Sequence, residues 1–298
     1  MSVMRDNLNL GPSELRRQLK DGFVFAAGVF NGISAMIAER SGFKSTYLSG
    51  SGVAGSMGYP DLSVTTLTEV VAEAARIVNV TRSPLIADID TGFGETINVT
   101  RTVREMERAG VSAVHMEDQV LPKKCGHLNG KRIIGTEEMV SKIRAATDAR
   151  KNPDFMIIAR TDSRSVYGLE DAIARANASF EAGADAVFTE ALESHDEFIE
   201  FASRVDGPLM ANMTEFGKSP LLSVQELRDA GYRMVIFPLT VFRAFLKNAQ
   251  EVYSRLLMEG TQRDFLDMMM TRSEYYSLIG YDEYEREDSD LFSRNSVK

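Results

Sequence analysis

The sequence predicts a single (β/α)₈ barrel, and three observations lead to that prediction. Eight short apolar runs, rich in Val, Ile and Phe, alternate with amphipathic helical stretches from residue 23 to about residue 258. After the first run, a Gly boundary and a Pro boundary precede the later runs in strict alternation. The mean spacing is about 30 residues per unit, which suits a barrel of about 250 residues better than an open doubly wound sheet.

The eight predicted strands are, in order, 24–30, 46–49, 85–90, 113–117, 155–161, 186–190, 209–213 and 234–238. The second, fourth, sixth and eighth follow a small residue and Gly, and this Gly suits the left-handed position that ends a helix. The third, fifth and seventh follow Pro84, Pro153 and Pro208. Each strand is expected to be followed by a helical segment.

Residues 1–298 are therefore expected to form one domain, with the barrel at about 23–258 and a helical extension at about 259–298. The extension carries a helical pattern and ends in an acidic, Tyr-rich segment, so we expect it to pack on the barrel or on a neighbouring subunit. Length alone, at 298 residues and 44% hydrophobic, would also fit two smaller domains.

Composition indicates which kind of molecule this protein binds and in which cellular compartment it is expected. Acidic residues outnumber basic ones, 43 to 34, so the basic surface of a nucleic-acid binder is missing and a small molecule is the expected partner. A single cysteine, Cys125, excludes an intrachain disulfide and favours a reducing compartment. Residues 1–20 lack a signal-peptide core, and no apolar run approaches the ~20 residues of a membrane span. A cytoplasmic protein is expected.

The carboxyl ends of the predicted strands are unusually polar, and barrel enzymes place their chemistry at these ends. Several of the polar residues are spaced two apart, which puts both side chains on one face of a strand. The set comprises Ser49, Gly50, Asp88, Asp90, His115, Glu117, Asp118, Arg160, Asp162, Glu190, Asn212 and Thr214.

Asp88 and Asp90 form the clearest pair, and Glu117 is the natural third acid from the next strand. Three scattered His residues and one Cys supply a zinc site poorly, whereas carboxylate oxygens and water suit Mg²⁺, with Mn²⁺ as a substitute. The alternative is structural: one Asp caps the next helix or pairs with Arg160. The strand-end chemistry favours the metal.

The loop at 122–131, PKKCGHLNGK, gathers two Lys, the single Cys and a His among Gly residues. Neighbouring positive charge lowers the pKa of a thiol, so Cys125 is expected to exchange a proton near neutrality. The alternatives are that Cys125 is a small buried hydrophobe and that Lys123 and Lys124 are merely solvated.

The segment 50–55, GSGVAG, follows a strand and matches the dinucleotide fingerprint G-x-G-x-x-G. We expect no helix to begin there, so the segment would lack the helix N-terminus that seats a pyrophosphate. A nicotinamide or flavin site is therefore rejected. The Gly residues are expected to let backbone amides approach a carboxylate.

With these motifs in view, the chain resembles the isocitrate lyase and phosphoenolpyruvate mutase superfamily, and within it the 2-methylisocitrate lyase branch. The resemblance runs almost end to end, and KKCGH is its most specific motif because it separates the lyases from the mutases and hydrolases. The matching segments are YLSGSG, GYPDL, DIDTGFG, HMEDQ, KKCGH, ARTD, FTEA, ANMTEFG, FPLTVFRA, MMTRSEYY and YDEYE.

The resemblance implies Mg²⁺ at Asp88 and Asp90, with Glu117 assisting through water. It implies Cys125 as the catalytic acid, with Arg160 and His127 among the catalytic residues and Asp61 and Lys123 in support. Tyr47 and a metal-linked carboxylate are both candidates for the proton acceptor. The implied substrate contacts are Ser49, Gly50, Ser51, Cys125, Gly126, Arg160, Glu190, Asn212, Met213, Thr214, Arg243 and Arg272.

The implied activity is cleavage of (2R,3S)-2-methylisocitrate to pyruvate and succinate, a step of propionate breakdown through the methylcitrate cycle. Such proteins are homotetramers in which the last helix swaps between subunits. Three positions bear on specificity: Ser51 and Thr189 depart from the pattern, and Phe188 is expected to leave room for a methyl group. The alternatives are isocitrate lyase, 2,3-dimethylmalate lyase, an oxaloacetate- or phosphonopyruvate-processing relative, and an inactive carboxylate-binding barrel.

Overall fold

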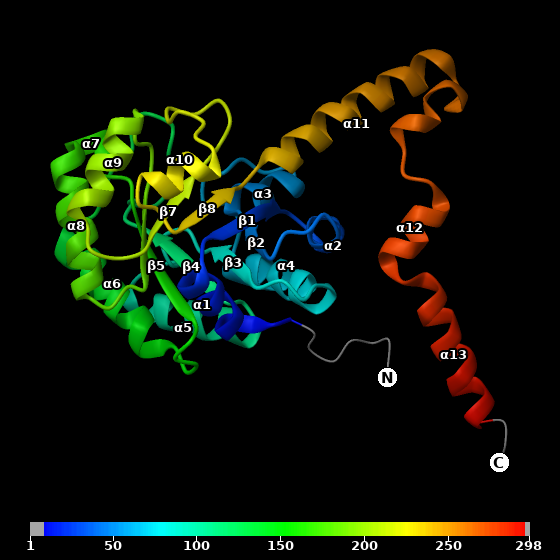
Figure 1. Ribbon diagram of the computed structural model, residues 1–298, viewed down its shortest axis with the longest axis horizontal. Coiled ribbons are helices and arrows are strands. Elements are labelled where there is room, and N and C mark those ends of the chain that lie inside the picture. The colour runs from blue at the N-terminus through cyan, green and yellow to red at the C-terminus, as the bar shows by residue number, and fades with distance from the viewer. Residues whose placement is uncertain (1–8, 296–298) are drawn as a thin grey trace.

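The computed structural model describes residues 9–295 and has a closed barrel of eight parallel strands at its centre (Figure 1). Neighbouring strands follow chain order, and β1 pairs with β8 through Ala26 and Ile236 to close the barrel. All eight predicted strands are confirmed. They are β1 Val24–Val29, β2 Ser45–Leu48, β3 Leu85–Asp88, β4 Ala113–Glu117, β5 Met156–Thr161, β6 Ala186–Thr189, β7 Leu209–Asn212 and β8 Met234–Phe237.

Helices surround the barrel and extend beyond it (Figure 1). Those up to the last strand are α1 Gly11–Asp21, α2 Gly32–Arg40, α3 Gly50–Ser56, α4 Leu67–Val80, α5 Thr96–Arg108, α6 Thr136–Ala149, α7 Arg164–Tyr167, α8 Leu169–Glu181, α9 His195–Arg204 and α10 Val224–Asp229. After β8 come α11 Thr240–Glu259, the 3₁₀ helix η1 Arg263–Met268, α12 Arg272–Ile279 and α13 Tyr281–Asn295. Among residues 9–295, no helix is both long and apolar enough to cross a lipid bilayer.

The glycines that precede four of the strands have the backbone geometry that the sequence predicts. Gly42, Gly110, Gly183 and Gly231 have φ values of 100°, 83°, 100° and 97°. Side chains other than hydrogen are strained in this region, so Gly ends the helix and turns the chain toward the next strand. The alternation of helix and strand is therefore set by local chemistry.

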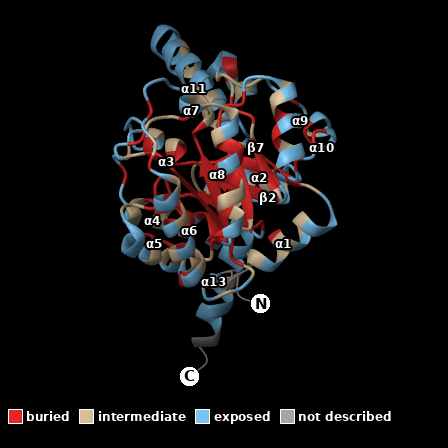
Figure 2. Cartoon of the chain, turned by 90° about the vertical axis from the view of Figure 1, so that its left-hand side faces the viewer, coloured by how far each residue is buried: buried red, intermediate tan, exposed pale blue. Residues whose placement is uncertain are grey.

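The strands separate two apolar cores (Figure 2). The inner core fills the barrel with side chains such as Ala26, Ile86, Ile158 and Met210, and Leu15 of α1 packs with it. The outer core lies between strands and helices. Helix α1 thus closes the amino-terminal end of the barrel, and the opposite end is left for the polar residues.

The prediction that no helix begins at Gly50 is wrong, because α3 starts there with Ser49 at its N-cap position. Gly is a poor helix former, so the local sequence argues against this helix. Tertiary packing overrides that preference: a Cβ on Gly55 would lie 3.0 Å from the ring of Phe242, so the glycine lets α3 pack closely there.

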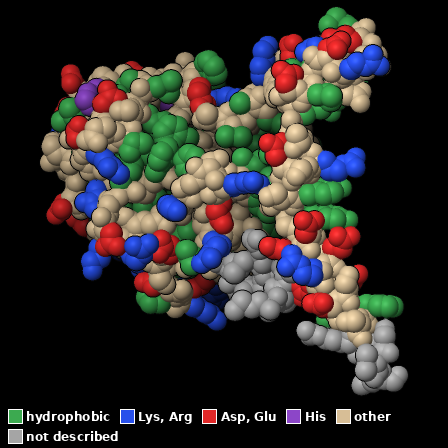
Figure 3. Space-filling model, turned by 45° about the vertical axis from the view of Figure 1, so that its right-hand side comes forward, with side chains coloured by type: hydrophobic (Ala, Val, Ile, Leu, Met, Phe, Trp, Pro, Cys, Tyr) green, Lys and Arg blue, Asp and Glu red, His purple; other side chains and the backbone are tan. Residues whose placement is uncertain are grey.

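The carboxyl-terminal helices form an arm, defined here as residues 240–295, which leaves the barrel after β8 (Figure 1). Within the described chain, α11 has no buried side chain, and hydrophobic side chains reach the surface along the arm (Figure 3). Helix α12 turns back to contact α2. The start of α11 packs on the barrel, where Phe242 and Phe245 contact Phe30 at the end of β1. The rest of α11 does not cover its own barrel as a barrel helix normally does.

Candidate active site

Most of the polar strand-end residues point into the barrel mouth, directly above the inner core. Asp118 does not, because it is directed toward α8, where Arg175 Nη1 lies 3.2 Å from its Oδ2. Side chains alternate between the two faces of a strand, so a residue two positions after an inner-core residue also faces inward. Ile86 precedes Asp88 in this way, and the same relation holds for Ile158 with Arg160 and Phe188 with Glu190. The predicted convergence of these side chains at one end of the barrel is confirmed.

Asp88 and Asp90 converge, but not through strand parity alone. Strand β3 ends at Asp88, and Asp90 lies in a turn with φ of 48°, where its amide donates to Asp88 Oδ1 at 3.0 Å. The amide of Gly50 donates to Asp88 Oδ2 at 3.1 Å, as expected of a glycine that approaches a carboxylate. A Cβ on Gly50 would lie 3.1 Å from an oxygen of each aspartate, so both carboxylates face the same point.

Asp88, Asp90 and Glu117 are called the acidic cluster below, and Lys123 extends into it from the loop 122–131. Its Nζ lies 3.0 Å from Asp90 Oδ1 and forms a second ion pair with Asp61. Burial opposes its charge, yet the surrounding carboxylates, Glu117 first, hold the Lys123 pKa well above its ordinary value. The alternative that Lys123 is merely solvated is wrong, since its side chain is 2% exposed.

The acidic cluster keeps unsatisfied acceptor oxygens. Among residues 9–295, both carboxylate oxygens of Glu117 and Oδ1 of Asp90 lack a donor in hydrogen-bond geometry, although Arg160 Nη1 lies 3.2 Å from Glu117 Oε2 and Lys123 Nζ lies 3.0 Å from Asp90 Oδ1. Burial raises the pKa of Glu117 well above its ordinary value and that of Asp90 to about 6. Buried carboxylates without enough compensating charge are the donor set of a hard divalent cation.

The same described residues contain no ready group of three His, Cys, Asp or Glu ligands. Two aspartates with Glu117 behind them fit a cation whose coordination is completed by water or substrate oxygens, as is usual for Mg²⁺. The residues therefore fit the cation, as a partial site that a bound molecule would complete.

Tyr47 and His115 lie beside Asp88 in the inner wall. The Tyr47 hydroxyl is 2.7 Å from His115 Nε2, and this nitrogen is 3.6 Å from Asp88 Oδ1. Burial lowers the His115 pKa to about 4 and raises the Tyr47 pKa well above its ordinary value. Both groups are therefore uncharged near neutral pH, and a phenol that holds its proton is a weak acceptor.

Arg160 links three carboxylates at the opposite side of the mouth. Its guanidinium lies 3.2 Å from Glu117, 2.9 Å from Asp162 and 3.1 Å from Glu190. The sequence left open that Arg160 pairs with Asp88 or Asp90 in place of a metal. In the structure Arg160 instead pairs with Glu117 on this side. Phe188 lies beneath Arg160, with the ring centroid 5.0 Å from the guanidinium carbon.

Phe188 forms part of the floor of the site. Its side chain is fully buried in the inner core, where it also packs edge-on against His115. The expectation that Phe188 leaves room for a methyl group stays a prediction. The depth of this residue in the barrel depends on register with the neighbouring strands, which the sequence does not show.

The loop 122–131 covers the Arg160 side of the mouth. Gly126 packs so closely that a Cβ there would lie 2.5 Å from Arg160 Nη2 and 2.7 Å from Glu190 Cδ. His127 Nε2 lies 2.9 Å from Glu190 Oε1, while its Nδ1 accepts the amide of Lys218 at 2.9 Å. Because Nδ1 is an acceptor, the proton of the neutral ring is on Nε2, toward Glu190.

Cys125 is half-buried in this loop, and burial raises the pKa of its thiol above the ordinary value. The prediction of a lowered pKa is wrong, because Lys123 is directed into the acidic cluster and not toward the thiol. The thiol is therefore protonated near neutral pH. A protonated thiol is suited to donate a proton and not to act as a nucleophile.

Other predicted contacts complete the wall on the side of β7. Asn212 Nδ2 lies 3.3 Å from both oxygens of Glu190, and Arg243 Nη1 donates to the Thr214 hydroxyl at 3.3 Å. Arg243 also pairs with Glu215 at 2.6 Å. Ser49 is buried at the start of α3, and Ser51 in the same helix is half-buried.

Met213 and Arg272 are not brought to this wall by their side chains. Met213 packs in the outer core, where its sulfur accepts the amide of Leu222 at 3.2 Å. Arg272 is the first residue of α12, on the arm that stands apart from the strand ends (Figure 1). Their roles as substrate contacts stay predictions.

The sequence reasoning missed Lys131. Its side chain is 1% exposed, and its Nζ donates to the Gly126 carbonyl and lies 2.7 Å from Asp162 Oδ1. The position at the end of a Gly-rich loop was the single sequence signal. A lysine there reads as solvated, and only the folded contacts show otherwise.

Known proteins are similar to this chain over most of its length. A family model described as phosphoenolpyruvate phosphomutase matches residues 15–257. A 2-methylisocitrate lyase of Aeropyrum pernix is 53% identical over 94% of this chain and 91% of its own length. The 2-methylisocitrate lyase of Escherichia coli is 47% identical over 91% of this chain and 92% of its own length.

Solved structures agree with this similarity. A 2,3-dimethylmalate lyase, described as a PEP mutase/isocitrate lyase superfamily member, matches with a TM-score of 0.89 at 38% identity, over 94% of this chain and 95% of its own. Oxaloacetate acetylhydrolase in complex with 3,3-difluorooxalacetate matches with a TM-score of 0.90 at 34% identity, over 96% and 98%. The similarity therefore covers the barrel and most of the arm.

Proposed function

This chain belongs to the phosphoenolpyruvate phosphomutase family, in the PEP mutase/isocitrate lyase superfamily, and from that premise we propose that it cleaves (2R,3S)-2-methylisocitrate to pyruvate and succinate. It is a carbon–carbon lyase. One observation carries the proposal: a protonated Cys125, on the loop that covers Arg160 and Glu190, shares a barrel mouth with the acidic cluster of Asp88 and Asp90. Breakdown of propionate through the methylcitrate cycle is the matching metabolic role.

We propose that Mg²⁺, or Mn²⁺ in its place, is held by Asp88 and Asp90 with Glu117 assisting through water. When bound, the ion would lower the pKa of the substrate hydroxyl and stabilise the nascent pyruvate carbonyl oxygen. The unsatisfied oxygens of Glu117 and Asp90 support this assignment, because a cation would compensate their buried charge. The two cations beside these carboxylates are shared with other acids, because Lys123 also pairs with Asp61, and Arg160 also pairs with Asp162 and Glu190.

The reaction needs a proton acceptor and a proton donor on opposite halves of the substrate. In this proposal a carboxylate linked to the ion takes the hydroxyl proton, because the bound ion would bring the acidified hydroxyl next to these carboxylates. Tyr47, the other predicted acceptor, keeps its own proton near neutral pH. The carbon–carbon bond then breaks, and its electron pair passes into the succinate half as an aci-carboxylate.

The succinate half lies on the Arg160 side in this proposal. Arg160, Asn212, Thr214 and the backbone at Gly126 would stabilise the aci-carboxylate through charge and hydrogen bonds. Cys125 gives its proton to the carbanion carbon, and the thiolate later regains a proton from the acceptor carboxylate through solvent. The loop 122–131 must exclude water during this step, because water would quench the carbanion.

A product assay tests the function directly. The purified protein with Mg²⁺ is incubated separately with 2-methylisocitrate, isocitrate, 2,3-dimethylmalate and oxaloacetate, and pyruvate, glyoxylate and succinate are measured. The highest kcat/KM is expected for 2-methylisocitrate, with pyruvate and succinate in equal amounts. Higher kcat/KM on another acid would assign the chain to that activity, and binding without turnover would make it an inactive carboxylate-binding barrel.

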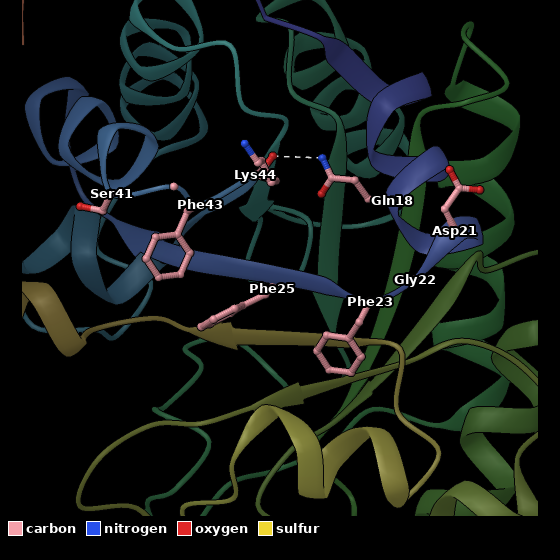
Figure 4. A pocket seen from close by; sticks show the side chains of 9 residues that line it. Gln18, Asp21, Gly22, Phe23, Phe25, Ser41, Phe43 and Lys44 are labelled. Carbon is pink, nitrogen blue, oxygen red and sulfur yellow. Dashed lines mark hydrogen bonds between the residues drawn. The ribbon is translucent and has the colours of Figure 1, made fainter.

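We also propose that the protein is a homotetramer whose subunits exchange their arms. An aromatic cluster lies on the outer side of β1 and β8, where the Phe25 ring is 4.9 Å from Phe43, which precedes β2, and 5.2 Å from Phe237. Phe25 and Phe43 line a cavity of about 430 Å³ that Gln18 and Lys44 also line (Figure 4). An arm from a second copy would cover this face, since the chain's own α11 does not.

A further inference from the structure

We propose that Lys131 is a positioning residue. It binds the loop 122–131 to Asp162, the carboxylate that also pairs with Arg160, and so determines the positions of Gly126 and Cys125. The inference deepens the proposed lyase function and rests on it for the catalytic part. Its structural part, the hold on the loop, stands on the contacts of Lys131 alone.

The first step is the reach of the Lys131 side chain. Its Nζ donates to the carbonyl oxygen of Gly126, five residues earlier in the same loop, and to Asp162 Oδ1 at 2.7 Å. The side chain is 1% exposed and that of Asp162 is 0% exposed. A charge-assisted contact shielded from water in this way is stronger than one on the surface.

The second step is that Asp162 is shared with Arg160. Its Oδ2 accepts from Arg160 Nε at 2.9 Å, and its Oδ1 accepts from Nη2 at 3.2 Å. Lys131 and Arg160 therefore meet on one carboxylate oxygen. Burial opposes the charge of Asp162, but the two cations hold its pKa below the ordinary value, so the carboxylate is present as the acceptor of both.

The third step is that the loop has little freedom where Lys131 holds it. Gly126 is packed against Arg160 and Glu190 so closely that no side chain fits. His127 provides a second attachment, between Glu190 and the amide of Lys218. Cys125 lies beside both attachments. Release of the Gly126 carbonyl would let the segment at 125–126 move away from Arg160, although His127 would still hold one end.

The sole cysteine provides a readout that needs neither substrate nor activity. Cys125 is the one thiol in the chain, so its alkylation by iodoacetamide is followed by intact mass. The test variant is Lys131→Met, which keeps much of the side-chain volume and removes the charge and the donors. The control is Lys124→Met, which removes a lysine from the same loop but touches neither Gly126 nor Asp162 among the contacts described.

In Lys131→Met, Cys125 is expected to be alkylated about 10-fold faster than in the wild-type protein. Loss of one charge-assisted hydrogen bond should make opening of the loop more favourable by about that factor. Removing a nearby cation would by itself slow the reaction by disfavouring the thiolate, so a faster rate reports exposure. Lys124→Met should stay within about twofold of wild type. Lys131→Arg, which retains charge and donors, should alkylate more slowly than Lys131→Met.

The same variants separate positioning from a general structural effect. Lys131→Met should lower kcat for the lyase reaction more than it raises KM, since substrate still meets Arg160 and the acidic cluster. If Lys131→Met does not fold, Lys131→Gln carries the same expectation. Alkylation at the wild-type rate in a folded Met or Gln variant overturns the proposal, even if the lyase function holds. If the wild-type protein shows no lyase turnover but Cys125 is alkylated faster in Lys131→Met, the proposed function is overturned and the role of Lys131 in holding the loop stands.

Discussion

Gly126 lies so close to Arg160 that a Cβ on residue 126 would be 2.5 Å from the guanidinium Nη2. The loop and the strand end therefore fit together only if residue 126 has no side chain. Arg160 cannot give way easily, because Glu117, Asp162 and Glu190 hold it from three directions. This contact leads to the first of five predictions.

Gly126→Ala should lower turnover by about 100-fold or more while the barrel stays folded, because the methyl group would displace the loop from Arg160. Steady-state kinetics and thermal unfolding measure the two effects. The matched control is Gly135→Ala, where a Cβ would meet nothing within 4 Å. Equal activity of the two variants would show that the close contact is unimportant for turnover.

Cys125→Ser should retain pyruvate binding in the presence of Mg²⁺ but lower turnover by about 100-fold or more, the usual worth of a positioned acid. A hydroxyl is close in size to the thiol but is a much weaker acid, so the proton transfer and not the fold is affected. Calorimetric binding of pyruvate is the control. Turnover near that of the wild type would remove Cys125 from the mechanism.

Removal of divalent metal by chelation and dialysis should abolish turnover, and added Mg²⁺ should restore it. Asp88→Asn should weaken Mg²⁺ binding measured by calorimetry, because an amide oxygen carries no charge to hold the ion. Glu39→Gln, at the end of α2, serves as a matched loss of one half-buried carboxylate, since Glu39 Oε2 accepts from the amides of Arg82 and Ser83. Activity that survives complete removal of metal would exclude the metal role of Asp88 and Asp90.

The pH dependence of stability should carry the signature of His115 in the metal-free protein. Its pKa is about 4 when folded, against 6.5 as the ordinary value, so the unfolded state binds the proton first as pH falls. The contribution of neutral His115 to the free energy of unfolding is fully present above pH 6.5 and is lost as the pH falls toward 4. At pH 5 the loss should be about 2 kcal/mol.

His115→Gln should remove that component of the acid sensitivity. Denaturant unfolding at pH 7 and pH 5 is compared for both proteins, so that any constant cost of losing the stacked ring cancels. A variant that loses as much stability as wild type between the two pH values would contradict a neutral, buried His115.

Arg272 should act on the active site of a neighbouring subunit if arms are exchanged. Arg272→Ala and Cys125→Ala are each expected to lose most activity. Hetero-oligomers formed by co-expression should regain part of it, because some sites then combine an intact Cys125 with the Arg272 of another copy. A mixture that stays as inactive as its parents, with hetero-oligomers verified by mass, would place Arg272 outside the site or within its own barrel.

Much of the candidate site could be read from the sequence, because its strand-end residues obey local rules. The period of two along a strand and the Gly or Pro before each strand place Asp88, Glu117, Arg160 and Glu190 at the barrel mouth. These features depend on residues a few positions apart. The role of Cys125, in contrast, came from family resemblance, and the charge argument for it was wrong in direction.

The sequence by itself thus determined the eight strands, the left-handed glycines between them and the inward direction of Asp88, Arg160 and Glu190. Only the tertiary structure decided that α3 is helical, that Lys123 meets Asp61, and that Lys131 meets Asp162. The physical reason is range. Backbone conformation follows from steric and hydrogen-bonding preferences of neighbouring residues, whereas burial and ion pairing join residues far apart, 62 positions for Lys123 and Asp61.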